Sequence, residues 1–259
     1  MWLLLACTAP SSAPETGSPD TSAPGCAWPD AEDKDFEDST TDDWVAEAAE
    51  AWSVTVVDDI ARCGSYAARF EIREGDSPTG DGFRAELHEL ADFAAPFGSE
   101  VWYAFSTLVP DDWVDLDNRA VIAQWHATPD LADGEAWRSP PLAVRYRSGE
   151  VYVTARHASE PVQPENDAPE QELWRSEGAW EKGVWHDWVF GVRWTYEDEG
   201  FVQVFHDGEQ VVSYEGPIGY NDVAGPWFKW GIYRDDVPEV QVLFHDAYRR
   251  GDSYDAVAP

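Results

Sequence analysis

Apolar and polar residues alternate with a period of two along most of the chain beyond residue 50. This spacing is typical of β-strands with one buried face, because successive side chains of a strand point to opposite sides of a sheet. Helical periodicity is weak, and we expect one helical turn, within residues 41–52. The predicted strands cover residues 52–58, 65–72, 83–90, 100–109, 120–127, 142–148, 150–157, 185–195, 201–207, 209–216, 227–234 and 240–249.

The links between these strands predict how they pair. Ser148-Gly149 and Asp207-Gly208 separate two pairs of strands, and such dipeptides accept the positive φ of tight hairpin turns. The long segment 158–174 is rich in proline and acidic residues, so it is either disordered or a flap beside a site. About a dozen antiparallel strands in one domain predict two stacked sheets. We therefore expect an all-β jelly-roll sandwich, concanavalin-like, in a single domain.

Four predicted strands carry polar, titratable side chains on one face and apolar ones on the other. The residues assigned to the polar faces are Arg84, Glu86 and His88; Ile122, Gln124 and His126; Arg145 and Arg147; and Trp227, Lys229, Gly231 and Tyr233. Together they would form a basic surface suited to an anionic, hydroxyl-rich ligand. Each residue also has a structural alternative, because cross-strand ion pairs contribute little and a histidine beside a glutamine is often hydrogen-bonded structure.

The composition narrows the choice of partners. The formal net charge is −34, which argues against nucleic acid, since phosphate binding needs clustered Lys and Arg. Residues 1–43 hold ten of the 51 acidic side chains, so most of the acidity belongs to the folded part. The 15 Trp, 10 Tyr and 11 Phe indicate a large β core, with a few rings left as platforms for sugars.

Residues 1–25 differ from the rest and are expected to be a signal remnant and a tether, leaving residues 26–259 as the domain. Leu4-Leu5-Ala6-Cys7 resembles a lipobox, although no basic region precedes it and the apolar run is short for a signal. The alternative is that this stretch is not a signal. We favour an exported protein attached to the membrane through a lipidated Cys7.

The remaining cysteines and the histidines bear on cross-links and metals. With Cys7 lipidated, Cys26 and Cys63 are left to form a disulfide in an oxidising compartment. The six histidines are scattered without zinc-ligand spacing.

Three motifs on the polar faces resemble a known family. "RAEL" (84–87), "QWH" (124–126) and "WFKWGIYR" (227–234) follow the order of the signature regions of jelly-roll polysaccharide lyases, where alginate lyases carry R-[ST]-E-L, Q-[IV]-H and Y-F-K-A-G-x-Y. The wider text of residues 30–259 is similar to the heparin-lyase-like and glucuronan-lyase-like branch. Departures from the alginate pattern, Trp125, Trp227, Trp230 and Arg234, leave the substrate open.

The resemblance implies β-elimination on a uronic-acid-containing polysaccharide. Arg84 and Gln124 would neutralise the substrate carboxylate, as an oxyanion hole does. His126 would take the carbon-5 proton and Tyr233 would protonate the leaving oxygen, or Tyr233 would serve in both roles. Carboxylates at neighbouring subsites would be held by Lys229, Arg145, Arg147 and His88.

The chemistry needs no cofactor, but members of that branch bind a structural calcium, and Asn221 and Asp222 in "YND" resemble part of its ligand loop. The alternative for this pair is an ordinary turn. The competing function is a non-catalytic glycan-binding jelly-roll lipoprotein. A glycoside hydrolase is disfavoured, because no strand carries the paired carboxylates that it needs. We expect a monomer.

Overall fold

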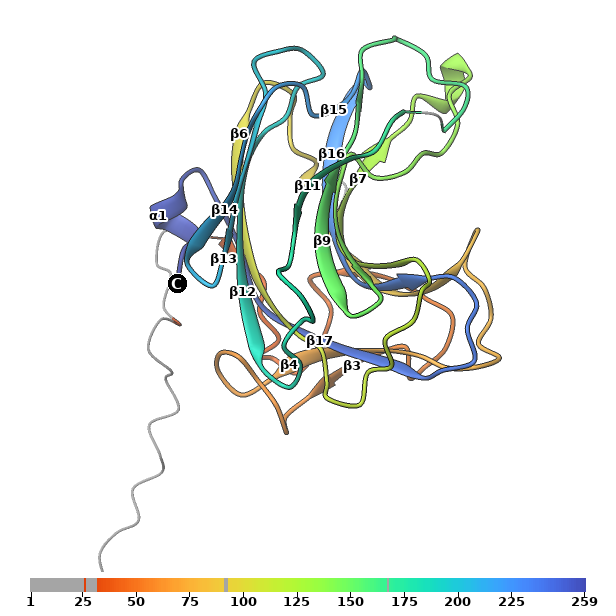
Figure 1. Cartoon of the computed structure of the whole chain (residues 1–259), viewed down its shortest axis with the longest axis vertical. Coiled ribbons are helices and arrows are strands. Elements are labelled where there is room, and N and C mark those ends of the chain that lie inside the picture. Colours follow the sequence, from red (N-terminus) through yellow and green to blue (C-terminus); the bar gives the residue numbers. More distant parts are fainter. Residues whose placement is uncertain (1–25, 27–31, 91–92, 167) are drawn as a thin grey trace, which may run out of the picture.

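The computed structural model describes residue 26 and residues 32–90, 93–166 and 168–259. Cys7 and the predicted tether lie outside these residues. Two antiparallel sheets lie face to face, as Figure 1 shows. The first has the order β14 (Glu209–Glu215), β13 (Phe201–His206), β12 (Trp185–Arg193), β6 (Glu100–Leu108), β17 (Gln241–Gly251), β4 (Ala67–Ile72) and β3 (Val54–Val57), with β1 (Glu32–Asp33) also paired to β17.

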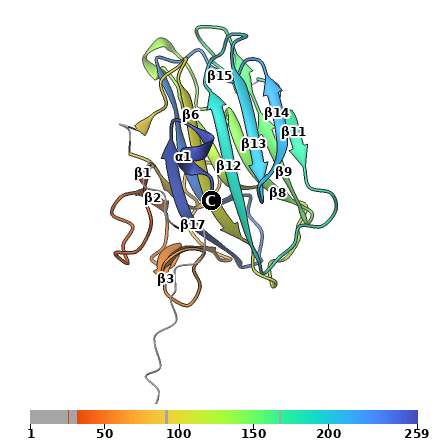
Figure 2. The ribbon, with the colours of Figure 1, turned by 90° about the vertical axis from the view of Figure 1, so that its left-hand side faces the viewer.

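The second sheet has the order β11 (Gln171–Arg175), β9 (Glu150–Ala155), β8 (Leu142–Arg147), β7 (Ala120–Thr128), β16 (Ala224–Arg234), β5 (Phe83–His88) and β2 (Val45–Ala48). A short parallel pair joins β10 (His157–Ala158) to β15 (Gly219–Tyr220). The 3-10 helix η2 (Leu131–Asp133) lies in the loop after β7. Helix α1 (Tyr254–Val257) packs on the outer side of the first sheet (Figure 2). The predicted all-β jelly-roll sandwich is confirmed.

The core lies between the sheets and takes the apolar half of the alternating pattern. Trp125 and Phe228 of the second sheet contact Phe190 and Phe105 of the first, with ring centroids 4.7 and 5.2 Å apart. Each buried aromatic ring removes roughly 150–250 Å² of surface from water. The large aromatic content therefore serves mainly to hold the two sheets together, as the composition indicated.

The predicted strands are all present among the described residues, and the two predicted hairpins are confirmed. Their turn residues have the expected positive φ, 54° and 83° at Ser148 and Gly149 and 49° and 79° at Asp207 and Gly208. The predicted helical turn within 41–52 is wrong, because Val45–Ala48 forms the edge strand β2 and pairs with β5. Pairing with a neighbouring strand outweighs the helical preference of its alanines and glutamates.

Simple alternation fails at one residue of β7. Ile122 was assigned to the polar face with Gln124, but it lies in the core. The pairing of β7 with β8 shifts between Val121 and Ala123, which marks a β-bulge. The extra residue turns Ile122 inward and leaves Val121 on the opposite face, without moving Gln124 and His126 from theirs.

Two further features concern the predicted disulfide and membrane-spanning helices. Cys26 and Cys63 form the expected disulfide, which joins the start of the domain to the segment between β3 and β4. Among the described residues, no helix is long and apolar enough to span a membrane.

Candidate active site

The four strands with polar faces are neighbours in the second sheet, in the order β8, β7, β16 and β5. The face that they turn away from the core opens into a cavity of about 750 Å³. Of the residues expected at the site, seven line this cavity: Arg84, Gln124, His126, Arg145, Arg147, Lys229 and Tyr233. Sheet order thus brings together residues that lie up to 149 positions apart.

The cavity reverses the charge of the chain. Seven basic side chains line it, against three acidic ones. The whole sequence has 51 acidic and 17 basic residues, so the basic residues are strongly concentrated here. A concave surface with one sign of charge focuses potential and attracts the opposite ion. The cavity is therefore suited to an anionic ligand even though the protein as a whole is acidic.

His126 is a neutral imidazole with one nitrogen left for a ligand. Its Nδ1 donates to the carbonyl oxygen of Ala127 at 2.7 Å, so the lone pair resides on Nε2, which has no hydrogen-bond partner among the described residues. Burial lowers the pKa of His126 to about 4, and the positive charges of Lys229 and Arg84 act in the same direction. Its ring stacks on Trp227 at 5.1 Å. The geometry offers a fixed proton acceptor at neutral pH.

Tyr233 carries a protonated hydroxyl in the same cavity. The hydroxyl donates to Asp81 at 2.8 Å, and the guanidinium groups of Arg84 and Arg119 lie 4.2 and 4.4 Å from the ring centre. Burial and the bond to Asp81 raise the pKa of Tyr233 above its usual value. The side chain is therefore a proton donor at neutral pH rather than a phenolate base.

An ionic network forms the cavity floor, and its one member outside the lining is the buried Glu86. Lys229 contacts Glu47 at 2.6 Å and Glu86 at 3.0 Å. Glu86 also accepts a hydrogen bond from Gln124 at 2.5 Å and contacts Arg84 at 3.3 Å. The Gln124 amide has a second N–H for a ligand. The network holds the ends of Arg84, Gln124 and Lys229 in place from below.

Comparisons with known proteins assign this architecture. The sequence profile described as "Polysaccharide lyase" matches residues 36–249. The chain belongs to the polysaccharide lyases. No significant match was found among curated proteins.

Three solved structures share the fold of this lyase. An endo-β-1,4-glucuronan lyase from the fungus Trichoderma reesei has a TM-score of 0.73 and 17% identity over 85% of this chain and 96% of its own. Alginate lyase A1-II′ of family 7 has a TM-score of 0.54 and 13% identity over 79% and 83% of the two chains. Alginate lyase PA1167 from Pseudomonas aeruginosa has a TM-score of 0.51 and 17% identity over 79% and 87%.

The remaining expected residues lie at the rim of the cavity or beside it. Arg145 donates to the Thr154 hydroxyl at 2.9 Å and pairs with Glu170 at 3.2 Å. Arg147 is more exposed and pairs with Asp117. His88 is not among the described residues that line the cavity, and the centroid of its ring lies 4.6 Å from that of Trp227. The expected contact between His88 and substrate is thus not supported by its position.

Loops and an edge strand supply lining residues that strand alternation did not identify. They are Glu47, Thr79, Gly80, Asp81, Arg119, Trp137, Arg138, Ser139, Pro140, Arg156, Asn166 and Glu170, together with Val121 of β7 and Tyr152 of β9. Asn166 and Glu170 come from the segment 158–174, so this part of it lies beside the site as a flap, whereas residues 171–174 belong to the edge strand β11. Trp137 is 61% exposed, and its ring lies 5.7 Å from that of His126. The high aromatic content was the sequence signal that could have pointed to such a residue, since flat rings stack on sugars.

The predicted calcium ligands are separated in the structure. Asp222 lies with Asp130 and Glu135, and oxygens of the three carboxylates are within 4.8 Å of one another. Asn221 is outside this group and its amide donates to the Ser159 carbonyl at 3.0 Å. Burial raises the pKa of Asp222 to about 7, although Arg138 bonds to it. The Arg138 guanidinium pairs with Glu135 and Asp222 but not with Asp130, so three carboxylates share one cation. Carboxylate oxygens are ligands that suit a hard cation.

Proposed function

We propose that this lyase cleaves a glucuronan-like or mixed uronate polysaccharide by β-elimination. The observation that carries the proposal is the placement of neutral His126 and protonated Tyr233 in one cavity lined by seven basic side chains. Binding an anion needs only the charge. The two proton-transfer groups are what elimination requires in addition.

The carboxylate of the bound uronate would contact Arg84 and the second N–H of Gln124. These contacts stabilise the charge that builds on the carboxylate as the carbon-5 proton leaves, because aligned donors in a site without water need not reorganise. The planar guanidinium of Arg84 matches a carboxylate in shape. In the free enzyme it bonds to the Thr79 carbonyl and to the carboxylates of Glu47, Glu86 and Asp81, so the substrate carboxylate would replace some of these partners.

His126 Nε2 takes the proton from carbon 5, the carbon-4 to oxygen bond breaks, and a double bond forms between carbons 4 and 5. The leaving oxygen receives the Tyr233 hydroxyl proton. Asp81, which accepts that proton's hydrogen bond in the free enzyme, is placed to direct its return. In the A1-II′ lyase, a substrate is bound to a variant with a His-to-Asn and a Tyr-to-Phe substitution, which supports the pairing of these residue types.

The charge of the protein favours a sparsely charged polymer over a highly sulfated one. The acidic outer surface repels polyanions within about 8–10 Å at ordinary salt, so only the cavity attracts them. One carboxylate per sugar matches a cavity of separated arginines. The fold shared with a glucuronan lyase supports the same choice.

The test is incubation with glucuronan, alginate, hyaluronan and heparin, followed by the ultraviolet absorbance of the unsaturated product. We expect turnover of at least one polyuronate, glucuronan first, and its loss in Tyr233→Phe. Tyr196→Phe is the matched control, because Tyr196 packs against Phe97 away from the cavity lining. Binding of all four polymers without turnover would contradict the proposal and favour a glycan-binding protein.

Calcium is proposed as a structural ion at Asp130, Glu135 and Asp222, without Asn221. It would offset the carboxylate charge that Arg138 leaves uncompensated, and it takes no part in the chemical steps. Calcium is expected to raise the thermal midpoint of the native lyase and not that of Asp222→Asn. An equal response of both proteins would exclude this site.

We also propose that the lyase is exported, anchored through a lipidated Cys7, and monomeric. The Cys26–Cys63 disulfide supports an oxidising compartment. Labelled palmitate should enter the wild-type protein in its host and not Cys7→Ser. Light scattering should give the mass of one chain, 29.0 kDa before processing.

A further inference from the structure

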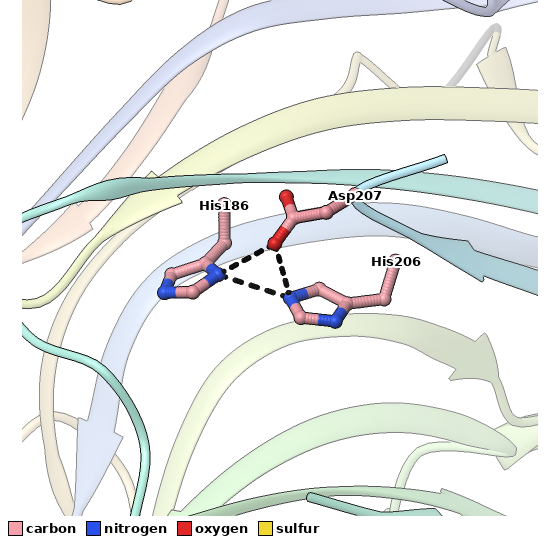
Figure 3. A group of neighbouring side chains, drawn as sticks. All are labelled: His186, His206 and Asp207. Carbon is pink, nitrogen blue, oxygen red and sulfur yellow. Dashed lines mark hydrogen bonds and ion pairs between the residues drawn. The ribbon is translucent and has the colours of Figure 1, made fainter. Parts of the chain in front are cut away.

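Two histidines and an aspartate converge at a place remote from the cavity lining. Figure 3 shows His186, His206 and Asp207 with one atom of each turned toward the other two. His186 Nδ1 lies 2.9 Å from Asp207 Oδ2 and 3.0 Å from His206 Nε2, and the latter lies 3.1 Å from Asp207 Oδ2. The three atoms form a nearly equilateral triangle.

The first sheet and its hairpin build this triangle. His186 is in β12, His206 is in the adjacent β13, and Asp207 begins the tight turn that follows. Three tryptophans surround the two rings, with Trp180 4.1 Å from His186 and with Trp188 and Trp174 4.7 and 5.7 Å from His206. His186, His206 and Asp207 are not among the described residues that line the cavity.

The second ring nitrogen of His186 and the second carboxylate oxygen of Asp207 each form a hydrogen bond with the backbone. His186 Nε2 lies 2.9 Å from the Glu181 carbonyl oxygen, which only accepts, so this nitrogen carries a hydrogen. The other oxygen of Asp207 accepts from the Asp187 amide at 2.7 Å. Metal-binding histidines commonly donate their second ring N–H to a carbonyl in this way, which fixes the tautomer.

The protons on these atoms do not satisfy the triangle without an added cation. In neutral His186 the lone pair is on Nδ1 and faces a carboxylate oxygen at 2.9 Å, which is repulsive. A hydrogen on His206 Nε2 can be shared between His186 Nδ1 and Asp207 Oδ2. It does not lie between those two atoms, so their repulsion remains. The arrangement needs either an extra proton on His186 or a metal ion in the middle.

We propose that His186, His206 and Asp207 bind a divalent transition-metal ion of the zinc class. Two imidazoles and a carboxylate are borderline ligands that suit zinc better than calcium. At zinc–ligand distances of about 2.0–2.1 Å, tetrahedral ligand atoms are roughly 3.3 Å apart, so each atom of the triangle moves by only a few tenths of an ångström. This site was not visible as a spacing of histidines along the sequence.

The surroundings indicate a site with an accessible fourth position. The Asp207 side chain is 45% exposed, whereas that of His186 is 7% exposed, so an ion enters from the turn and keeps a water there. The metal would clamp β12, β13 and the Glu181 backbone together at one end of the sandwich. Its role is structural, separate from the proposed elimination.

The test is titration of the chelator-treated, full-length protein with zinc chloride by calorimetry, and with cobalt chloride by visible absorption. We expect one zinc per chain and the absorption bands of tetrahedral cobalt. Cobalt should also quench part of the tryptophan fluorescence. Zinc at 100-fold over its Kd should raise the thermal midpoint by ~5–8 °C.

Asp207→Asn is the sharpest variant, since asparagine tolerates the positive φ of the turn while losing the carboxylate. It should weaken zinc binding by more than the roughly 10–100-fold that follows loss of an outer partner. His206→Gln should abolish the cobalt bands, and the exposed His157→Gln is the matched control and should change neither measurement. Failure of the folded wild-type protein to bind zinc, or equal affinity in Asp207→Asn, would overturn the proposal and leave a proton-bridged network. Lyase activity is measured in parallel and is expected to stay unchanged in Asp207→Asn, so the zinc site and the proposed function are tested separately.

Discussion

His126 in the cavity and His186 in the opposite sheet have the same side chain and opposite surroundings. The Ala127 carbonyl fixes one nitrogen of His126, and the Glu181 carbonyl fixes one nitrogen of His186. Burial and nearby cations then lower the pKa of His126 to about 4, whereas Asp207 raises the pKa of His186. The first ring is left with an open lone pair, and the second faces two other ligand atoms.

The difference shows that the surroundings of the ring, burial first and nearby charge second, decide what a histidine can do. Burial, with a smaller contribution from Lys229 and Arg84, keeps His126 neutral and able to accept a proton, while the two cations attract an anion. Asp207 stabilises a cation at His186, whether proton or metal. A single acidic chain thus contains an anion-binding cavity and a cation-binding cluster, because side chains are sorted by sheet face and turn.

The largest effect is expected from removing the proposed base. His126→Ala should lower kcat/KM by about 10²–10⁴-fold, because general-base catalysis contributes on that order. His206→Gln should leave kcat/KM unchanged when measured on the same polyuronate. A comparable loss in both variants would show that the two histidine sites are not independent.

Substitutions in the ionic network of the cavity floor should lower the free energy of unfolding more than a substitution at the rim. Lys229→Met removes the nearer of the two cations that Glu47 and Glu86 share and leaves them only Arg84, so the free energy of unfolding should fall by up to about 3–5 kcal/mol. Arg147→Met removes an exposed pair with Asp117 and should cost about 0–1 kcal/mol. Urea unfolding measures both, and equal losses would mean that the floor network is as weak as a surface pair.

The contributions of His126 and His186 to the stability of the protein should change with pH in opposite directions. Because the folded pKa of His126 is below the usual 6.5, its contribution to stability is complete above pH 6.5 and is lost as the pH falls toward 4. The folded pKa of His186 is raised above the usual value, so its contribution to stability is complete below pH 6.5. That contribution is lost as the pH rises through the folded pKa of His186. NMR titration of the ring protons checks both, and the acidic limb of kcat/KM should likewise lie near pH 4. A limb or a His126 titration near pH 6.5 would contradict the environment described for this ring.

The smallest expected effect concerns the rim. Trp137→Ala should raise KM by about 5–10-fold with little change in kcat, since loss of a stacked ring costs about 1 kcal/mol. Leu131→Ala, an exposed residue of the preceding 3-10 helix outside the cavity lining, is the control. If kcat fell instead of KM rising, Trp137 would be acting through the neighbouring His126 ring.

The sequence by itself determined most of the strands, both hairpins, the disulfide pair and most of the polar cavity face, but not the edge strands β2 and β11. Alternation has a period of two in any strand, so it places Arg84, Lys229 and Tyr233 on one side without knowledge of the partner strands. The motif order then pointed to the family that the profile match confirmed.

Only the tertiary structure decided the rest, because it depends on register and on loop paths. The bulge that turned Ile122 inward is set by pairing between β7 and β8. The position of His88 outside the cavity lining depends on how side chains pack, and its ring lies beside that of Trp227. Loops alone bring Arg119 and Trp137 to the cavity. The triangle of His186, His206 and Asp207 exists because β12 and β13 pair in one register, and residues 20 positions apart in sequence show no sign of that contact.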